Sequence, residues 1–366
     1  MKKRRICWIT GDYFIDVDML LVPYLQEHCP SWQIDWYVIR TSGSRIQISI
    51  NTPTKVYQLK YRGKDPRIIW NYYKMFDDMQ ISQSDIIYSD FLGVPYYYGV
   101  LLHYNNGVPV VHAAHNIIPY KGWPNKKLMK WYVNYSFKHL KYVHIFSKYL
   151  ERYFCSHFSG KEILICPMTV KGYGEVTTNN YTIDPSKLNL LFFGNIKENK
   201  RLDLLIDAVK SLSIEEQNRI HLTIAGKCDN TKRYLDQIGE CNCISTFFKR
   251  IDDQEIPELF TKHQFLVLPY EDVAQSGPQM IACFYDTPVI STDIDGFRES
   301  IIDGVNGFLF KVNNKKSLSL VIMKASRMSQ FEYEDMRKNV HNYVQNNYNL
   351  EVISAKYINY FNKILK

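Results

Sequence analysis

Short apolar runs that end in glycine or polar residues recur through the second half of the chain. They are Leu190–Phe193, His221–Gly226, Phe265–Tyr270 and Pro288–Thr292. Each run has only four to six residues, and apolar residues at spacings of three and four follow it, as in Leu202, Leu205 and Val209. Strands that alternate with helices predict parallel βαβ units and therefore an α/β fold.

The first half of the chain has the same alternation with weaker turn signals. Its candidate strands are Arg5–Thr10, Gln33–Ile39, Ile86–Tyr88, Val108–Ala113 and Val143–Phe146. These runs predict a second doubly wound, Rossmann-like domain. A chain of 366 residues can hold two such domains, each with its own core. We expect an N-terminal domain over 1–170, a polar linker over 171–187 and a C-terminal domain over 188–345.

The residues that follow the strands of the second half are the candidate binding positions, because ligands of open parallel sheets bind beyond the carboxyl ends of the strands. Ser276 and Gly277 precede Pro278, a residue suited to the first turn of a helix, and a helix N-terminus binds anions. Lys200 follows the first strand of this half and would add a positive charge. This pattern predicts a phosphate site.

Five segments, in order and spacing, resemble the retaining GT-B glycosyltransferases of the bacterial family 4 or group 1 type. They are Gly194 with Lys200 before Leu202–Ile206, Phe265–Tyr270, Gln275–Pro278, Thr287–Ile290 and Glu299–Phe310. The closer match is a subgroup with a Gln-Ser-Gly signature. The resemblance implies the GT-B fold, two Rossmann-like domains facing across a cleft, with a final helix at 346–366 that crosses back to the first domain.

The same resemblance implies an activity. Such an enzyme moves a sugar from a UDP- or GDP-sugar to a glycan or lipid-linked acceptor, with retention and without a cofactor or metal, in bacterial capsule, lipopolysaccharide or exopolysaccharide assembly. Two glutamates common in the family fall at Val273 and Ile281 here. The alternatives are therefore a nucleotide-sugar epimerase of the same fold, a catalytically inactive GT-B partner, or a basic membrane-binding protein.

The resemblance also assigns roles to individual residues. The catalytic candidates are His115, Asp12 and Gln275, and the alternative for His115 is a loop histidine bonded to backbone. The acceptor-side candidates are Gly11, Tyr13 and Asn116. The donor-binding candidates are Gly194, Asn195, Lys200, Arg250, Glu271, Asp272, Ser276, Gly277, Pro278 and Glu299.

Positive charge is concentrated between Phe91 and Leu150. This window of 60 residues has seven lysines and no acidic residue, and the rest of the chain contributes only +1 of the net charge of +8. Lysines at spacings of three and four predict a basic helix face with tryptophan and tyrosine interleaved, formed by Lys127, Lys130, Lys138 and Lys141 with Asn134. We expect an anionic membrane surface to bind it, rather than nucleic acid. The alternative is a solvated face whose aromatic residues pack inward.

Three further features bear on localisation and metals. The longest apolar runs fall far short of the roughly 20 residues of a membrane span. The eight cysteines are scattered and include no zinc-binding spacing, which favours unpaired thiols in a reducing cytoplasm. Together with the basic helix face, this predicts a cytoplasmic protein peripheral to the inner face of the membrane. Asp293-Ile-Asp295 matches the short metal-binding Asp-x-Asp pattern of the other glycosyltransferase fold. Because so short a motif often arises by chance, we expect no metal.

Overall fold

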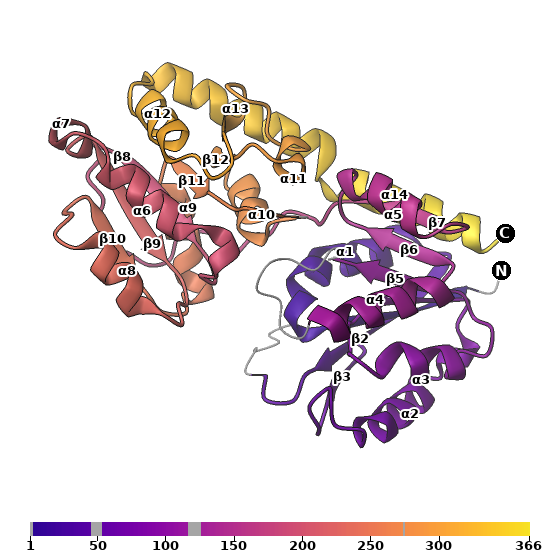
Figure 1. The fold of residues 1–366 in the computed structure, drawn as a ribbon. Helices are drawn as coiled ribbons and strands as arrows, with labels where there is room; N and C mark the ends of the chain where they lie inside the picture. The colour runs from indigo at the N-terminus through magenta and orange to yellow at the C-terminus, as the bar shows by residue number, and fades with distance from the viewer. Residues whose placement is uncertain (1–2, 45–52, 116–125, 274) are drawn as a thin grey trace. The chain divides into compact units, whose positions relative to one another are not determined.

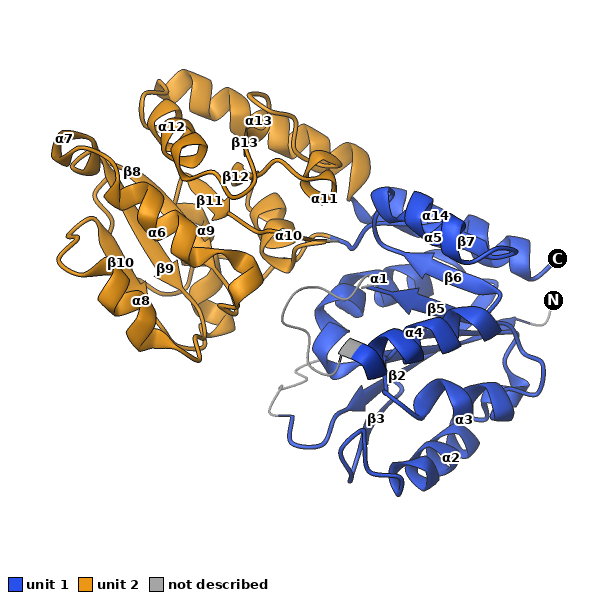
Figure 2. Ribbon diagram, viewed as in Figure 1, with its two compact units in different colours: residues 1–119, 123–169, 349–366 blue, residues 120–122, 170–348 orange. Residues whose placement is uncertain are grey.

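The computed structural model describes residues 3–44, 53–115, 126–273 and 275–366, and it divides into two compact units (Figure 2). Unit 1 contains the described residues up to Thr169 together with Asn349–Lys366. Unit 2 contains Val170–Tyr348. The segment 171–187, expected as a linker, therefore lies in unit 2.

Unit 1 is built on a seven-stranded parallel sheet in the order β3-β2-β1-β4-β5-β6-β7 (Figure 1). The strands are β1 (Arg4–Gly11), β2 (Trp32–Arg40), β3 (Lys55–Gln58), β4 (Ile86–Asp90), β5 (Val110–Ala114), β6 (Tyr142–Ile145) and β7 (Glu162–Ile165). The helices are α1 (Ile15–His28), α2 (Ile68–Asp78), α3 (Tyr97–Tyr104), α4 (Lys126–His139), α5 (Tyr149–His157) and α14 (Leu350–Ile364), with 3-10 turns at Asp12–Phe14 and Ile81–Gln83. Helices α1, α2, α3, α4 and α5 each lie between two strands of this sheet and supply crossovers of the kind that parallel pairing requires.

Helix α14 packs on unit 1 although it follows unit 2 in the sequence. Ile353, Tyr357 and Phe361, spaced by four residues, form its buried stripe against α1 and β7. The Tyr360 hydroxyl donates to the Glu162 carbonyl over 2.6 Å. Unit 1 is therefore completed by a helix from the far end of the chain.

Unit 2 has a six-stranded parallel sheet in the order β10-β9-β8-β11-β12-β13. The strands are β8 (Leu188–Phe193), β9 (Ile220–Ala225), β10 (Ile244–Phe247), β11 (Phe265–Leu268), β12 (Val289–Thr292) and β13 (Gly307–Phe310). The helices are α6 (Leu202–Lys210), α7 (Ile214–Gln217), α8 (Thr231–Ile238), α9 (Ile256–Lys262), α10 (Gly277–Phe284), α11 (Asp295–Arg298), α12 (Lys315–Ser326) and α13 (Gln330–Asn347), with 3-10 turns at Glu198–Lys200 and Asp253–Glu255. The predicted α/β, doubly wound fold class is confirmed.

A buried carboxylate fastens the segment before β8 to unit 2. Glu258 of α9 has no exposed surface and accepts hydrogen bonds from the backbone N–H groups of Asn180 and Tyr181, at 2.9 and 3.1 Å. Burial alone would raise the pKa of Glu258, but the Lys262 ammonium at 2.6 Å and these donors lower it to about 2. A paired, fully bonded carboxylate replaces the apolar contacts that this polar segment lacks.

Candidate functional site

The loops after β8 and β9 meet at two glycines at the carboxyl edge of the unit 2 sheet. Gly194 has φ +110°, in the left-handed region, and its N–H donates to the Ala225 carbonyl over 3.0 Å. A β-carbon at Gly226 would lie 2.0 Å from the Gly194 carbonyl oxygen. Because only glycine permits this approach, the turn at Gly194 is held close to the end of β9.

Lys200 returns from the 3-10 turn after β8 to lie beside Gly194. A β-carbon at Gly194 would lie 3.3 Å from the Lys200 ammonium and 3.3 Å from Cγ of Pro278. The ammonium also lies 5.2 Å from the centre of the Tyr270 ring. Burial, and secondarily the charge of Lys197, lowers the pKa of Lys200 to about 8. Within the described residues Lys200 forms no ion pair.

Helix α10 begins at this cluster. Ser276 caps it by accepting the Gln279 N–H over 3.4 Å, and Pro278, in the first turn, has no N–H to leave unsatisfied. The Tyr270 hydroxyl, just after β11, is buried and has no hydrogen-bond partner within the hydrogen-bond criteria among the described residues. The Ser276 side chain lies near it. The structure thus brings Gly194, Lys200 and the first turn of α10 together, as the sequence predicted, and adds Tyr270, which sequence reasoning did not assign.

The acidic residues after β11 are held by partners at the rim of this cluster. Glu271 pairs with Arg201 at 3.1 Å, and its N–H donates to the Asn199 carbonyl over 2.9 Å. Asp272 accepts from the Asn199 amide over 3.2 Å. Arg201 was missed in the sequence, although its place next to Lys200 was a usable signal. Both carboxylates therefore stand beside the Lys200 turn.

The remaining donor-side candidates occupy other loops. Asn195 is exposed in the turn after Gly194, and Gln275 is half-buried before α10. Arg250 is exposed after β10, the edge strand, two strands away from β8. Glu299 is exposed after α11, where its carbonyl accepts from the Tyr343 hydroxyl over 2.6 Å. These contacts do not bring Arg250 or Glu299 into the Lys200 cluster.

The Asp-x-Asp segment is held by an arginine. The Arg298 guanidinium donates to Asp293 over 2.5 and 2.9 Å and to Asp295 over 3.3 Å. This guanidinium is the largest cause that lowers the pKa of Asp293. Among the described residues, no group of three or more histidine, cysteine or acidic side chains is placed to hold a metal ion.

Unit 1 has a histidine and carboxylate pair where β4 and β5 end. The His115 Nε2 lies 2.8 and 3.0 Å from the two oxygens of Asp90, whose side chain is 1% exposed. The imidazole is stacked between Phe14, at 3.6 Å between ring centres, and Phe146, at 4.0 Å. Asp90 was not assigned from the sequence, although it closes the strand predicted at Ile86–Tyr88. Neighbouring strands in the sheet make the pair possible, and the two phenyl rings fix the imidazole plane.

The other unit 1 candidates follow β1. Asp12 is buried and accepts from the N–H and hydroxyl of Thr41, both over 3.4 Å. The Tyr13 ring covers Gly11, where a β-carbon would lie 2.8 Å from Cζ of that ring. The Tyr13 hydroxyl accepts the Leu92 N–H over 2.9 Å. Asn116 lies outside the described residues.

Helix α4 presents part of the predicted basic face. Lys127, Lys130, Asn134 and Lys138 are exposed, and Trp131 is 54% exposed and stacks on Tyr135. The prediction that Lys141 shares this face is wrong, because α4 ends at His139 and Lys141 instead pairs with Glu162 at 3.1 Å. Tyr132 and Phe137 of α4 are buried, as the alternative of inward-packed aromatic residues expects. No helix in the described part of the chain is long and apolar enough to cross a membrane.

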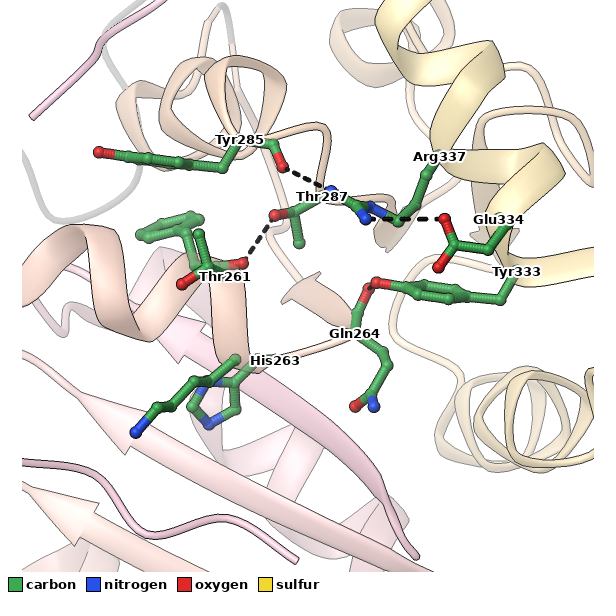
Figure 3. Close-up of a pocket in the computed structure, with 10 residues that line it drawn as sticks. Thr261, His263, Gln264, Tyr285, Thr287, Tyr333, Glu334 and Arg337 are labelled. Carbon is green, nitrogen blue, oxygen red and sulfur yellow. Dashed lines mark hydrogen bonds and ion pairs between the residues drawn. The ribbon is translucent and has the colours of Figure 1, made fainter. Parts of the chain in front are cut away.

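Unit 2 also has a pocket of about 200 Å³ away from the Lys200 cluster. Figure 3 shows its lining, with Tyr285 and Thr287 facing Arg337 and Glu334 of α13. His263 and Gln264 precede β11, and Thr287 precedes β12, so this pocket lies at the amino ends of the strands. The Arg337 guanidinium donates to the carbonyl oxygens of Asp286 and Tyr285. The pocket is thus at the edge of the sheet opposite the Lys200 cluster.

Comparison with protein families matches residues 175–346 to the family described as "Glycosyl transferases group 1". An "Uncharacterized 41.2 kDa protein in cps region" of Klebsiella pneumoniae is 24% identical over 131 residues, 36% of this chain and 35% of the relative. The "Uncharacterized glycosyltransferase MJ1178" of Methanocaldococcus jannaschii is 30% identical over 138 residues, 37% of each chain. The chain spans just over a third of the length of these curated relatives.

Solved structures resemble the chain over nearly its whole length. Sucrose-phosphate synthase of Thermosynechococcus elongatus has a TM-score of 0.78 and 12% identity, with 99% of each chain covered. Anabaena HepE, solved with UDP and glucose, has a TM-score of 0.73 and 14% identity, with 98% of this chain and 100% of the other covered. A glycosyltransferase from Rickettsia africae has a TM-score of 0.74 and 17% identity, with both chains fully covered. Identities this low establish a common fold and no more.

Proposed function

We propose that the chain transfers a sugar from a nucleotide-sugar donor, because residues 175–346 match the glycosyl transferases group 1 family and the chain has the GT-B fold. The donor is a UDP- or GDP-sugar, the acceptor is a glycan or a lipid-linked glycan, and transfer retains the anomeric configuration. The observation that carries the proposal is the half-buried Lys200, without an ion pair in the described residues, beside the first turn of α10.

The unit 2 cluster is suited to a leaving diphosphate. As the bond between sugar and phosphate breaks, negative charge grows on the diphosphate, and preorganised positive groups lower the barrier. Lys200 supplies a full charge and the α10 N-terminus supplies partial charges. With its pKa near 8, Lys200 is largely protonated at pH 7, and a bound anion would favour that form further.

Donor recognition would extend to the rim residues. The carboxylates of Glu271 and Asp272 would accept hydrogen bonds from sugar hydroxyls, and the Gln275 amide would accept or donate them. Ser276 would remain the cap of α10. Arg250 and Glu299, on neighbouring loops, would contact outer parts of the nucleotide. In support, the structurally similar HepE was solved with UDP and with UDP-glucose.

In unit 1 the His115 imidazole would contact the transferred sugar. Asp90 would orient the imidazole through Nε2, and Phe14 and Phe146 would hold its plane. Gly11 and Tyr13, after β1, would face the acceptor, and buried Asp12 would hold the following loop through Thr41.

Transfer would proceed without a metal ion. Positive charge for the diphosphate is supplied by Lys200 and α10, while Arg298 holds both carboxylates of the Asp-x-Asp segment. Activity that survives removal of divalent ions with EDTA would support this proposal, and activity restored only by Mg²⁺ or Mn²⁺ would contradict it.

The proposed setting is polysaccharide assembly at the inner face of a bacterial membrane. In support, one relative is by its name a protein in a cps region. The exposed lysines of α4, with Trp131 among them, suit an anionic lipid surface at roughly 1 kcal/mol per lysine. Flotation with liposomes containing anionic lipid should recover the protein, and reversal of charge at Lys127, Lys130 and Lys138 should release it. Reversal at Lys315, Lys316 and Lys324 of unit 2 is the matched control.

The first test of the activity is thermal stability with UDP, GDP, CDP and ADP. Ligand at 100 times its dissociation constant should stabilise the protein by roughly 2.7 kcal/mol. The base-selective shift should disappear in Lys200→Ala. No shift with any nucleotide would reject the transferase. With the matching nucleotide-sugar, products formed in the absence of acceptor would identify an epimerase instead.

A further inference from the structure

The chain between the end of β3 and the middle of α2 concentrates positive charge on unit 1. Residues 60–74 contain five basic side chains and one acidic side chain. Lys60, Arg62 and Lys64 are exposed, while the residues between them are half-buried. Within the described residues none of these three cations has an ion pair, and the one carboxylate, Asp65, is already paired inside the segment. The 60–74 segment therefore presents three cations that no carboxylate neutralises.

This segment lies at the carboxyl edge of the unit 1 sheet, because it follows directly on the parallel strand β3. A β-carbon at Gly63 would lie 2.8 Å from the Val94 carbonyl oxygen, so the backbone there lies close against the loop after β4. In the same loop the Leu92 N–H donates to the hydroxyl of Tyr13, the acceptor-side candidate after β1. The 60–74 segment thus borders the edge of unit 1 where the acceptor is expected.

Aromatic rings lie beside these cations. The Arg67 guanidinium lies 4.4 Å from the centre of the Tyr61 ring. Arg67, Trp70 and Lys74 are spaced by three and four residues and therefore share one face of α2. The Trp70 side chain is 72% exposed, and its ring centre lies 6.3 Å from that of Tyr73. An aromatic surface this exposed and surrounded by cations suits a partner that is flat and negatively charged.

We propose that the acceptor is an anionic glycan and that the 60–74 segment binds it. The carboxylate or phosphate groups of the glycan contact Lys60, Arg62 and Lys64. The apolar face of one of its sugar rings packs on the Trp70 indole. The inference rests on the proposed function and names the chemical class of its acceptor.

The chemistry of the side chains supports this class. Ammonium and guanidinium groups form charge-assisted hydrogen bonds with carboxylates and phosphates, and the Arg62 guanidinium can bind two oxygens of one anion. Three separate cations suit a chain of charged sugars better than a single small anion. The position beside the Tyr13 edge favours a glycan over a lipid surface.

The test is a set of dissociation constants for glycans that differ in charge. The probes are a neutral maltooligosaccharide, the same oligosaccharide carrying phosphate groups, and oligogalacturonate, whose charges are carboxylates. Wild type should bind at least one charged probe more tightly than the neutral one, and the tighter charged probe identifies the anion. This preference should shrink as the salt concentration rises from about 0.1 M to about 1 M, because salt screens exposed charges.

The triple variant Lys60→Gln, Arg62→Gln, Lys64→Gln should weaken the tighter charged probe by about tenfold, because each exposed charge contributes modestly. It should weaken the neutral probe by less than about twofold. Its melting temperature should match that of wild type, since these side chains have no ion pair within the described residues. Lys60→Arg with Lys64→Arg keeps the charges and should retain the affinity.

Trp70→Ala should weaken the charged and neutral probes by a similar factor, about two- to tenfold, because stacking does not depend on the charge of the sugar. The matched control replaces two lysines and one arginine by glutamine on unit 2. These are Lys315, Lys316 and Arg233, which are exposed. The control should leave every affinity unchanged.

Three results would overturn the inference. If wild type binds neither charged probe more tightly than the neutral one, or if the unit 2 control loses as much affinity as the triple variant, the inference is wrong. The proposed function then stands as long as a nucleotide raises the melting temperature. If the triple variant loses flotation with anionic liposomes but keeps its glycan affinities, the surface binds lipid and the inference is also wrong. If no nucleotide raises the melting temperature of wild type, the proposed function falls, and the acceptor role of this segment falls with it.

Discussion

The two units share a parallel α/β architecture but differ in what their sheets bury. Unit 1 buries titratable groups in and against its central strands: His112 of β5, His144 of β6 and Asp18 of α1 are fully or nearly fully buried. The centre of the unit 2 sheet is mainly apolar, as in the Phe265–Leu268 strand, and its charged candidates lie at strand ends. The comparison shows that one architecture can place its titrating groups inside the sheet or at its edge, with different consequences for pH dependence.

The buried network of unit 1 is closely bonded. Asp18 Oδ2 accepts from the Trp8 indole over 2.9 Å and from the Thr10 hydroxyl over 2.5 Å. Burial, with the charge of Asp90 adding, raises the pKa of Asp18 to about 8. The His144 Nε2–H donates to the Cys166 carbonyl over 2.8 Å, and the Nδ1 of the neutral imidazole accepts from the Tyr88 hydroxyl over 2.8 Å. Both groups are therefore held mainly in their neutral forms at pH 7.

The largest expected effect concerns the edge of unit 1. His115→Ala should lower the transfer rate by about 100- to 10,000-fold, the range for a positioned catalytic histidine, when measured at a temperature where the variant stays folded. Its melting temperature should also fall, because the buried Asp90 carboxylate loses its imidazole partner. Rates with the identified nucleotide-sugar measure this. His139→Ala, which removes an exposed histidine of α4, is the control. A His115→Ala enzyme with full activity would remove His115 from the reaction and leave unit 2 as the only catalytic unit.

The apolar core of unit 2 should give the next largest effect. Phe192→Ala, in β8 and fully buried, should lower the free energy of unfolding by about 3–5 kcal/mol through lost burial and a residual cavity. Chemical denaturation between pH 5 and pH 8 should show the same loss at each pH. Tyr88→Phe in unit 1 should cost less, about 1–3 kcal/mol, because His144 Nδ1 loses the Tyr88 hydroxyl at 2.8 Å and keeps only the Tyr357 hydroxyl at 3.3 Å. If the loss of unfolding free energy in Phe192→Ala changed with pH, the contrast between the apolar sheet of unit 2 and the titratable groups buried in unit 1 would be wrong.

Acid should act mainly on unit 1. Burial lowers the pKa of His112 and His144 to about 3, against about 6.5 in the unfolded chain. Each neutral histidine therefore contributes fully to the free energy of unfolding above pH 6.5, and this contribution is lost as the pH falls from 6.5 towards 3. The expected slope is about 1.4 kcal/mol per pH unit for each histidine. Denaturation between pH 4 and pH 7 should show a shallower slope for His144→Gln.

His263 of unit 2 is the matched comparison. Burial lowers the pKa of this histidine to about 4, and its Nε2 lies 2.8 Å from the Thr223 hydroxyl. If His263→Gln accounts for more of the acid slope than His112 and His144 together, the assignment of acid sensitivity to unit 1 is wrong.

A pH effect of opposite sign is expected as the pH rises. The pKa of Asp18 is raised from about 3.9 to about 8, so the folded protein keeps a proton there that the unfolded chain releases. The free energy of unfolding therefore falls as the pH rises between those two values. Asp18→Asn keeps an oxygen for Trp8 and Thr10 and carries no charge. Its stability relative to wild type should rise by about 1.4 kcal/mol per pH unit from pH 5 to pH 8. A constant difference would show that Asp18 is ionised in the folded protein.

Much of the fold could be predicted from the sequence, because buried parallel strands leave continuous apolar runs. The GT-B resemblance and fold class are confirmed by the family match and the solved structures. Edge strands were missed. Strand β3 reads Lys-Val-Tyr-Gln and is mostly exposed, and β10 has only one buried residue, so neither has an apolar run.

The candidate site was predicted in part. Gly194 and Lys200 follow β8 and Pro278 follows β11, so all three lie beyond the carboxyl ends of parallel strands, which is enough to expect them at one edge of the sheet. Pairings such as Asp90 with His115, or the approach of Gly63 to Val94, depend on which strands are neighbours and how a loop is fastened. Sequence spacing does not encode these distances. Donor, acceptor, retention and membrane binding stay proposals.

The place of α14 has a consequence for biosynthesis. Translation delivers the whole of unit 2 before α14, so unit 2 can finish folding while unit 1 still exposes the surface that Tyr357 and Phe361 will cover. Domains usually fold in order of synthesis, the earlier one first. In this chain the unit that begins first should be completed last, and a nascent chain stopped before Leu350 should resist protease in unit 2 alone.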